Sequence, residues 1–242
     1  MKKSHKVMLG AGVSVLALAA VAAVAGPMLY REYFAPTAAD TPSLSGSDQI
    51  MGTELGEPLD PAALAGTWRV SDASEAGYRV AEQLSGSDVT VTGRTSEVSG
   101  SFTISADGRT LETATITVDV DSISTDSPQR DAYFRDQALR TDEHPEATFV
   151  LSEPVTLAAV PGSGEAVTAS ARGDLTLAGE VRQVTADVEV RSDGRTAQIA
   201  GSVPITFADF GVTAPSLGFV TVEPEGFVEF ELEVERSAAA AN

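Results

Sequence analysis

Alternation of apolar and polar residues is the dominant pattern of the sequence from residue 66 onwards. It is clearest in segment 115–121, where the apolar positions are Ile116, Val118 and Val120 and the others are threonine or aspartate. A period of two is typical of a β-strand with one buried and one exposed face. The alternation stops at residues 124–128 and resumes at residues 147–151. This part of the chain therefore predicts two strands separated by a different element.

A short helix is predicted between these two strands. Asp126 or Ser127 can accept a hydrogen bond from a free helical N–H group, and Pro128 suits the first helical turn. The helix is expected over about residues 129–139, before His144-Pro145. A break within it is expected, because few of its residues share one apolar face.

Short segments with strand-like patterns fill the rest of the chain to residue 236. They lie at about residues 66–70, 76–84, 89–94, 102–104, 166–178, 181–191, 197–207 and 227–236. Asp107-Gly108 and Asp193-Gly194 predict hairpin turns, and Pro204 predicts a strand edge or a bulge. About ten short strands with one helix predict an all-β fold, either a closed barrel or a sandwich.

In the last of these strands, four apolar residues alternate with four glutamates. The apolar residues are Val228, Phe230, Leu232 and Val234, and the acidic ones are Glu229, Glu231, Glu233 and Glu235. Because the two sets point to opposite faces, we expect all four glutamates to be exposed.

The N-terminal 34 residues predict export and favour a membrane anchor. Basic residues precede an uncharged run from Val7 to Gly26, which is about the length that spans a hydrocarbon core of roughly 30 Å. A cleavable signal peptide is the alternative, with small-residue exits at Ala22 or Ala25. In both cases the positive-inside rule leaves the basic end in the cytoplasm and exports the rest.

Residues 35–65 are rich in Pro, Gly, Ser, Thr and acidic residues, and we expect a flexible acidic linker there. The folded domain is then expected over residues 66–236. The formal net charge of −19 over 242 residues argues against nucleic acid as a partner. The absence of cysteine excludes disulfides, thiol catalysis and Cys-ligated metals.

The sequence shows no set of residues that is typical of a catalytic site. His144 is the only histidine in the exported part, and a second imidazole that would complete a typical metal site does not exist. We therefore expect His144 in a surface loop, with no metal and no cofactor. Neither a GxGxxG motif nor a P-loop occurs. The protein is not expected to be an enzyme.

Two charged positions need an explanation. Glu82 shares the inward phase of Tyr78 and Val80, and Arg94 on the neighbouring strand is its expected partner. The pair is either a structural ion pair that fixes strand register or a polar anchor for a lipid head group. Arg130-Asp131, at the start of the helix, is expected to fasten the helical segment to the rest of the fold.

Several motifs, in order, resemble the YceI-like family of lipid-binding proteins. They are Ser122-Ile123-x-Thr125, Arg130-Asp131, Pro145-x-x-x-Phe149, Gly173-x-Leu175-Thr176-Leu177-x-Gly179-x-x-Arg182-x-Val184 and Phe207-x-x-Phe210-Gly211. The resemblance spans about residues 66–236. One departure is Tyr78–Glu82, where the family often has an aromatic-rich run ending in His. The resemblance implies an extended, lipocalin-like antiparallel barrel of eight strands that encloses a long isoprenoid or other amphipathic chain, without catalysis.

The leading hypothesis is an extracytoplasmic binding or carrier protein for an isoprenoid lipid or quinone-like amphiphile, tethered to the membrane by its N-terminal helix. The expected ligand-binding residues are Tyr78, Val80, Glu82, Phe102, Ile116, Val118, Phe134, Leu139, Phe149, Leu175, Leu177, Phe207, Phe210 and Phe219. The alternative is a ligand-free structural or stress-related envelope module with a filled core, because a barrel of this size can be filled by its own side chains. The oligomeric state stays open, with a homodimer among the options.

Overall fold

A computed structural model describes residues 38–44, 56–84, 86–216, 218 and 220–237. Its strands are β1 (Gly66–Val70), β2 (Glu75–Leu84), β3 (Ser87–Thr95), β4 (Val98–Ile104), β5 (Thr110–Asp119), β6 (Glu146–Leu151), β7 (Val155–Thr156), β8 (Val167–Leu177), β9 (Glu180–Ser192), β10 (Thr196–Thr206) and β11 (Val220–Arg236). Its helical elements are α2 (Pro61–Leu64), α3 (Pro128–Tyr133), the π-helical turn η1 (Phe134–Leu139) and the 3₁₀ turn η2 (Phe207–Phe210).

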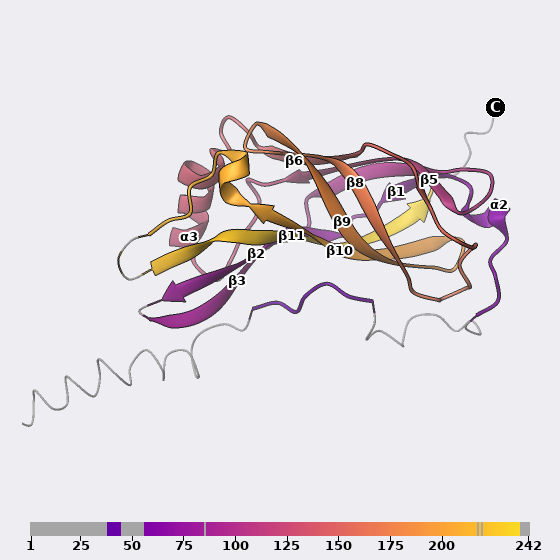
Figure 1. Ribbon diagram of the computed structural model, residues 1–242, viewed down its shortest axis with the longest axis horizontal. Helices are drawn as coiled ribbons and strands as arrows, with labels where there is room; N and C mark the ends of the chain where they lie inside the picture. The colour runs from indigo at the N-terminus through magenta and orange to yellow at the C-terminus, as the bar shows by residue number, and fades with distance from the viewer. Residues whose placement is uncertain (1–37, 45–55, 85, 217, 219, 238–242) are drawn as a thin grey trace, which may run out of the picture.

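Eight of these strands close into an antiparallel barrel. Their order is β1-β4-β5-β6-β8-β9-β10-β11, and β11 pairs back onto β1, with Val70 opposite Val234. The closed ring confirms the expected all-β barrel. In Figure 1 the barrel is elongated, with α3 at one end and α2 at the other.

The hairpin of β2 and β3 lengthens the barrel wall at the end where α3 lies (Figure 1). The long strand β11 makes this extension, because its C-terminal part pairs with β1 while Val220 to Glu231 pair with β2. The free side of β3 meets the loop after β5 through a bridge between Arg94 and Ser124. The interior therefore extends beyond the reach of β1.

Both predicted hairpin turns are confirmed. The Asp193 Oδ1 atom accepts hydrogen bonds from the backbone N–H groups of Arg195 and Thr196, each at 2.7 Å. Gly194 has a φ of +84°, which glycine adopts without steric cost. Asp107 makes the same kind of turn between β4 and β5. These two turns fix the register of the strands that they join.

The predicted helix between β5 and β6 is present and changes type part of the way along. Ser127 is its N-cap, and the side-chain oxygen accepts a hydrogen bond from the Arg130 N–H group at 3.4 Å. Six residues of α-helix are followed by six residues of π-helix, and Arg140, at a φ of 53°, ends the segment. The expected break is this change of helix type.

The last strand is longer than its sequence pattern indicates. Strand β11 begins at Val220, and its register with β2 shifts between Val222 and Gly226. The acidic stretch around Pro224 interrupts the alternation, so the sequence pattern did not indicate the first part of the strand. Pro204 lies in β10 beyond the last pairing with β9 at Ser202, so it is locally at a strand edge, as expected.

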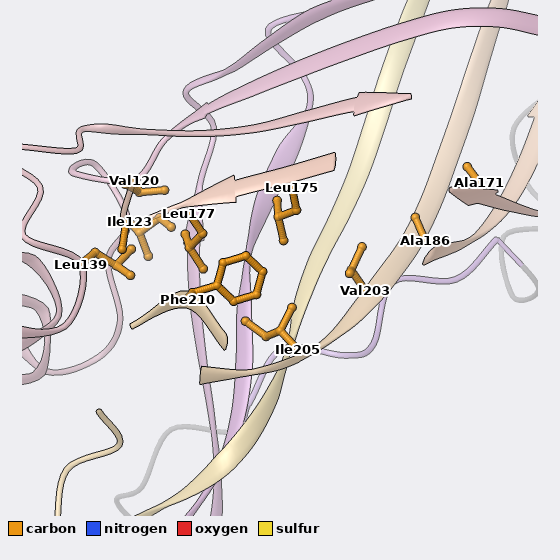
Figure 2. Packing of buried hydrophobic residues seen from close by; sticks show 11 residues of the cluster. Val120, Ile123, Leu139, Ala171, Leu175, Leu177, Ala186, Val203, Ile205 and Phe210 are labelled. Atoms are coloured by element: carbon orange, nitrogen blue, oxygen red, sulfur yellow. The ribbon is translucent and has the colours of Figure 1, made fainter. Parts of the chain in front are cut away.

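The buried apolar residues form two clusters inside the barrel. One contains Leu139, Leu177 and Phe210 beside the helical end and continues along the interior to Ala171 (Figure 2). The other surrounds Trp68, whose indole N–H donates a hydrogen bond to the Leu64 carbonyl oxygen at 2.8 Å. This bond fixes α2 against the opposite end of the barrel.

Two described parts of the region expected to be a flexible linker, residues 38–44 and 56–65, make hydrogen bonds to the folded domain. Residues 38–44 run along its outside (Figure 1), and Leu44 is only 1% exposed. The Leu44 N–H group donates to the Glu189 carboxylate at 2.7 Å, and Arg191 donates to the Leu44 carbonyl oxygen at 2.7 Å. Composition alone did not predict these contacts.

The predicted anchor, residues 1–34, lies outside the residues that the structure describes. Among the described residues, no helix is both long enough and apolar enough to cross a membrane. The choice between an anchor and a cleaved signal peptide therefore stays a prediction.

Candidate functional site: an apolar cavity with one polar end

Two adjoining cavities occupy the barrel interior. One, which we call the inner chamber, has a volume of about 240 Å³ and extends towards α2. The other, the outer chamber, has a volume of about 150 Å³ and lies beside α3, η1 and η2. Four residues line both chambers, and we call them the neck: Ala76, Val118, Ala147 and Val228. The chambers therefore lie end to end along the barrel.

The inner chamber is lined by inward-facing side chains of the barrel strands. Phe102, Ile116, Phe149 and Leu175 come from β4, β5, β6 and β8. Phe149 has room because the neighbouring strand carries Gly173, where an added Cβ would collide with the Phe149 ring and with backbone. Alternation thus supplies an apolar lining, and Gly173 leaves space for the Phe149 ring.

The outer chamber is enclosed by β2 and by the helical elements. The Tyr78 and Phe134 rings stack with their centroids 5.0 Å apart, which joins β2 to η1. Tyr78 also lies over Gly93 of β3, where a Cβ would collide with the ring. Phe210 of η2 is buried and closes another side of the same chamber.

The structure places every described ligand-binding candidate in the wall of this cavity. The inner chamber is lined by Phe102, Ile116, Val118, Phe149 and Leu175, and the outer chamber by Tyr78, Val80, Glu82, Val118, Phe134, Leu139, Leu177, Phe207 and Phe210. Phe219 lies outside the described residues. Their contact with a ligand stays a prediction.

Some wall residues were missed in the sequence. Val228, Phe230 and Leu232 of β11 line the cavity, and their alternation with glutamates was the signal that could have identified them. Arg130 also lines the outer chamber. Because Arg130 belongs to a short helix, no period-two pattern could indicate where its side chain points.

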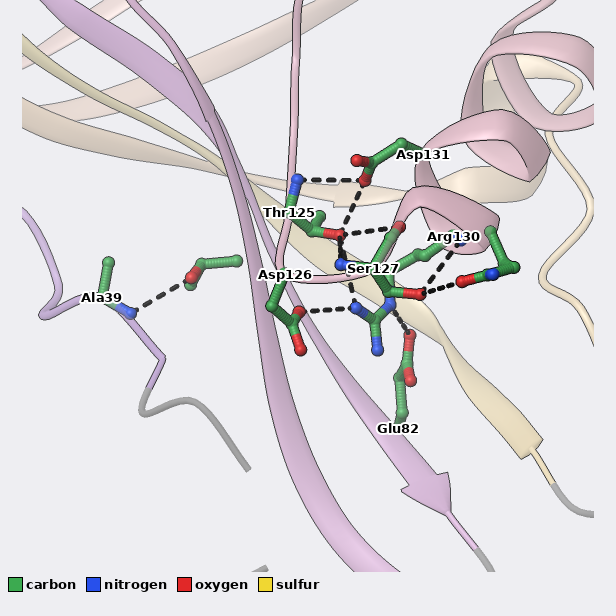
Figure 3. A network of polar contacts seen from close by, with 9 residues as sticks. Ala39, Glu82, Thr125, Asp126, Ser127, Arg130 and Asp131 are labelled. Atoms are coloured by element: carbon green, nitrogen blue, oxygen red, sulfur yellow. Dashed lines mark hydrogen bonds and ion pairs between the residues drawn. The ribbon is translucent and has the colours of Figure 1, made fainter. Parts of the chain in front are cut away.

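Three side chains form what we call the polar end of the outer chamber: Tyr78, Glu82 and Arg130. Glu82 is 7% exposed, and its Oε1 atom lies 3.6 Å from Arg130 Nε. Arg130 Nη1 also donates to Asp126 Oδ1 at 2.8 Å (Figure 3). Arg130 thus joins the interior carboxylate to an exposed one.

The predicted pairing of Glu82 with Arg94 is wrong. Strands β2 and β3 do pair as a hairpin, but Val89 lies opposite Glu82, and Arg94 lies opposite Gly77. Arg94 pairs instead with the Glu229 carboxylate. The partner of Glu82 is supplied by a helix that the hairpin register cannot reveal.

Burial controls the ionisation of the polar end. It raises the pKa of Glu82, and the positive charge of Arg130 only partly opposes this effect. Burial also raises the pKa of Tyr78; the positive charge of Arg130 opposes this, and Asp131 and Glu82 add smaller contributions that raise it. The Tyr78 hydroxyl therefore stays neutral, and among the described residues it has no hydrogen-bond partner.

Asp131 holds the helical segment in place, as expected. The Asp131 Oδ1 atom accepts hydrogen bonds from the Thr125 backbone N–H at 2.9 Å and from the Thr125 hydroxyl at 2.7 Å (Figure 3). Together with the Arg130–Glu82 ion pair, these bonds fasten α3 to the loop after β5 and to β2. The same contacts position Arg130 at the chamber.

The expectation that all four glutamates of β11 are exposed holds for Glu231 and Glu235, whereas Glu233 is half-buried and Glu229 is buried. Its side chain is 1% exposed, Arg79 Nε lies 2.6 Å from its Oε1 atom, and Arg94 pairs with its Oε2 atom. Arg79 also donates to the Ala39 carbonyl oxygen at 2.6 Å. Glu229 is buried on the outside of the barrel between these two arginines, and Arg79 connects the group to residues 38–44.

His144 lies in the loop before β6, half-buried against Gly179. Within the described part of the chain, no three His, Asp or Glu side chains are grouped so as to hold a metal ion. The expectation that the protein is not an enzyme stays a prediction.

These features define the class: a closed antiparallel barrel of eight strands with an elongated apolar cavity that is polar at one end. The chain belongs to the YceI-like domain family, whose family model matches residues 68–234. This membership confirms the resemblance seen in the sequence motifs. A comparison with curated proteins gives no significant match.

Two solved structures are similar to this chain. A polyisoprenoid-binding domain from Saccharophagus degradans, implicated in plant cell wall breakdown, has 19% identity and a TM-score of 0.55, covering 72% of this chain and 99% of that domain. BcnA from Burkholderia cenocepacia has 23% identity and a TM-score of 0.54, covering 68% of this chain and 98% of that protein. At these identities the similarity shows a shared fold.

Proposed function

We propose that this protein works outside the cytoplasm, where it binds one isoprenoid lipid or quinone-like amphiphile in its barrel and carries it. The observation that carries this proposal is the pair of apolar chambers joined at the neck. An enclosed apolar space with few polar groups suits an apolar ligand better than a polar metabolite. Two chambers placed end to end suit a long, narrow chain. No catalytic step is part of this proposal.

Membership of the YceI-like family supports the proposal. A protein of the same fold is described as a polyisoprenoid-binding domain, and the two structures align over almost the whole of that domain. The inward positions of our chain supply the apolar surface that such a chain would contact.

We propose that the protein works at the outer side of the cytoplasmic membrane. The apolar run of residues 7–26 follows a basic N-terminus, which supports export and an anchor. A tethered barrel would hold the apolar tail away from water while staying close to the bilayer.

The neck offers a direct test of binding. Ala147→Phe would place a ring between the chambers, and we expect it to weaken binding of geranylgeraniol, a C20 isoprenoid alcohol, by about tenfold or more because the tail could no longer pass. Trp68, the only tryptophan, lines the inner chamber, so its fluorescence can follow binding to the full chain.

The matched control is Val150→Phe, because Val150 is on the same strand and exposed. It should leave the affinity unchanged, and circular dichroism should show both variants folded. Equal binding by wild type and a folded Ala147→Phe variant would contradict a ligand that crosses the neck. If wild type takes up no geranylgeraniol, the alternative of a ligand-free envelope module gains support.

A further inference from the structure

We infer that the outer chamber selects the head group of the bound amphiphile, accepting a head group that donates hydrogen bonds and rejecting an anionic one. The tail then lies in the inner chamber, with the head group at Tyr78, Glu82 and Arg130. This inference rests on the proposed function and adds the orientation and the chemical class of the ligand.

The two chambers differ in polarity, and this difference sets the orientation. The inner chamber has one charged residue in its described wall, Arg109, which is engaged with Asp107 at 3.5 Å and with the Ala158 carbonyl oxygen at 3.3 Å. A polar head group placed there would lose its hydrogen bonds to water with little in return. The outer chamber contains a buried carboxylate, a guanidinium and a hydroxyl.

Carboxylates outnumber arginines in and around the polar end. Arg130 pairs with both Glu82 and Asp126, and the charges of Asp126 and Asp131 also act on Tyr78. The charge of Arg130 is already shared between two carboxylates, because its Nη1 atom donates to Asp126 at 2.8 Å and to the Thr125 hydroxyl at 3.3 Å, and its Nε atom faces Glu82. A phosphate or carboxylate head group would add a third negative charge beside this one arginine and would meet Glu82, and a buried like-charge pair is unfavourable.

A hydroxyl or N–H head group would find partners at the same place. The Glu82 carboxylate makes one ion pair, with Arg130 at 3.6 Å, so it keeps lone pairs that can accept a hydrogen bond. The Tyr78 hydroxyl, neutral and without a partner among the described residues, can donate to the head-group oxygen or accept from it. One donor–acceptor group on the ligand can therefore satisfy both side chains.

The experiment compares three probes that share one tail: geranylgeraniol, its methyl ether and geranylgeranyl monophosphate. Binding to the full chain is followed by Trp68 fluorescence. We expect the alcohol to bind tightest, the ether several-fold more weakly because it cannot donate, and the monophosphate at least about tenfold more weakly.

The deciding variant is Glu82→Gln, which removes the negative charge and keeps the size of the side chain. We expect it to bind the monophosphate about tenfold more tightly than wild type does, a gain that loss of folding could not produce. Glu75→Gln is the matched control, because Glu75 is on the same strand but exposed, and it should leave all three affinities unchanged.

Two results would overturn the inference: equal affinity of wild type for the alcohol and the monophosphate, or a folded Glu82→Gln variant with unaltered affinity for the monophosphate. If Glu82→Gln fails to fold, the comparison of the three probes on wild type decides alone. Failure of wild type to bind any probe would contradict the proposed function itself, and the inference would fall with it.

Discussion

One buried glutamate lies on each side of the barrel wall, and each is matched by arginine. Inside, Glu82 faces Arg130, and outside, Glu229 is held by Arg79 and Arg94. A charge removed from water is tolerated only where such partners are fixed in place. The two carboxylates differ in surroundings, because Glu82 faces a cavity and Glu229 is enclosed by two arginines.

Replacing Glu229 tests the outer of these sites. Glu229→Ala should lower the free energy of unfolding by about 3–5 kcal/mol, because it leaves Arg79 and Arg94 partly buried without their counter-charge. Urea unfolding of the full chain measures this loss. Glu231→Ala, an exposed neighbour on the same strand, should cost much less. Equal effects of the two substitutions would contradict a special role for Glu229.

Single residues were predictable where their phase on a strand decided their position. The burial of Glu82 followed from its phase with Tyr78 and Val80. Its partner did not, because Arg130 reaches it from a helix far along the chain. Glu229 could not be told from Glu231 by local pattern, since the arginines that bury Glu229 come from other strands.

At the scale of elements, the strands with regular alternation and aspartate–glycine turns were predicted well. Residues of β2, β8, β9 and β10 repeat every second position, and both hairpin turns are present. The start of β11 was missed, because Pro224 and its acidic neighbours interrupt the repeat where the strand bulges. Strand β7 has two residues, too few to show any period.

The β9–β10 turn has a stability that should depend on pH. Partial burial acts to raise the pKa of Asp193, but the hydrogen bonds from Thr196 and Arg195 together outweigh it, so the net pKa is lowered. Its pKa is therefore lower in the folded chain than the value of about 3.9 for an unfolded one. The stability from its ionised form is present above this value and is lost as the pH falls below it.

We therefore expect Asp193→Ala to lower the free energy of unfolding by about 1–3 kcal/mol at pH 7 and by less as the pH falls below about 4. Urea unfolding at several pH values measures this trend. Asp72→Ala, at an exposed aspartate in the turn after β1, controls for the loss of one acidic side chain. A loss of unfolding free energy in Asp193→Ala that does not change with pH would contradict stabilisation of the turn by the ionised Asp193 carboxylate.

The whole molecule is a long barrel with different ends. The register of β11, paired with β1 at one end and with β2 at the other, makes the interior longer than the shortest strands would allow. The α2 segment lies against one end, and α3, η1 and η2 enclose the other (Figure 1). Polarity at one end and apolar lining at the other give the cavity a direction.

The sequence predicted which residues face the interior but not whether the interior is hollow. Alternation identifies Phe102, Phe149 and Leu175 as inward-facing residues, whereas the space between them depends on strand register and on which neighbouring positions are glycine. Strand pairings join residues from distant parts of the chain, so a local sequence pattern cannot predict the space between the inward-facing side chains.

Native mass spectrometry of the full chain, purified without added lipid, can show whether the barrel holds a lipid. We expect a protein that carries one adduct of several hundred daltons, released by organic solvent and bearing a hydroxyl or N–H head group without a negative charge. A bare protein mass, together with no uptake of added geranylgeraniol, would contradict a lipid-binding barrel.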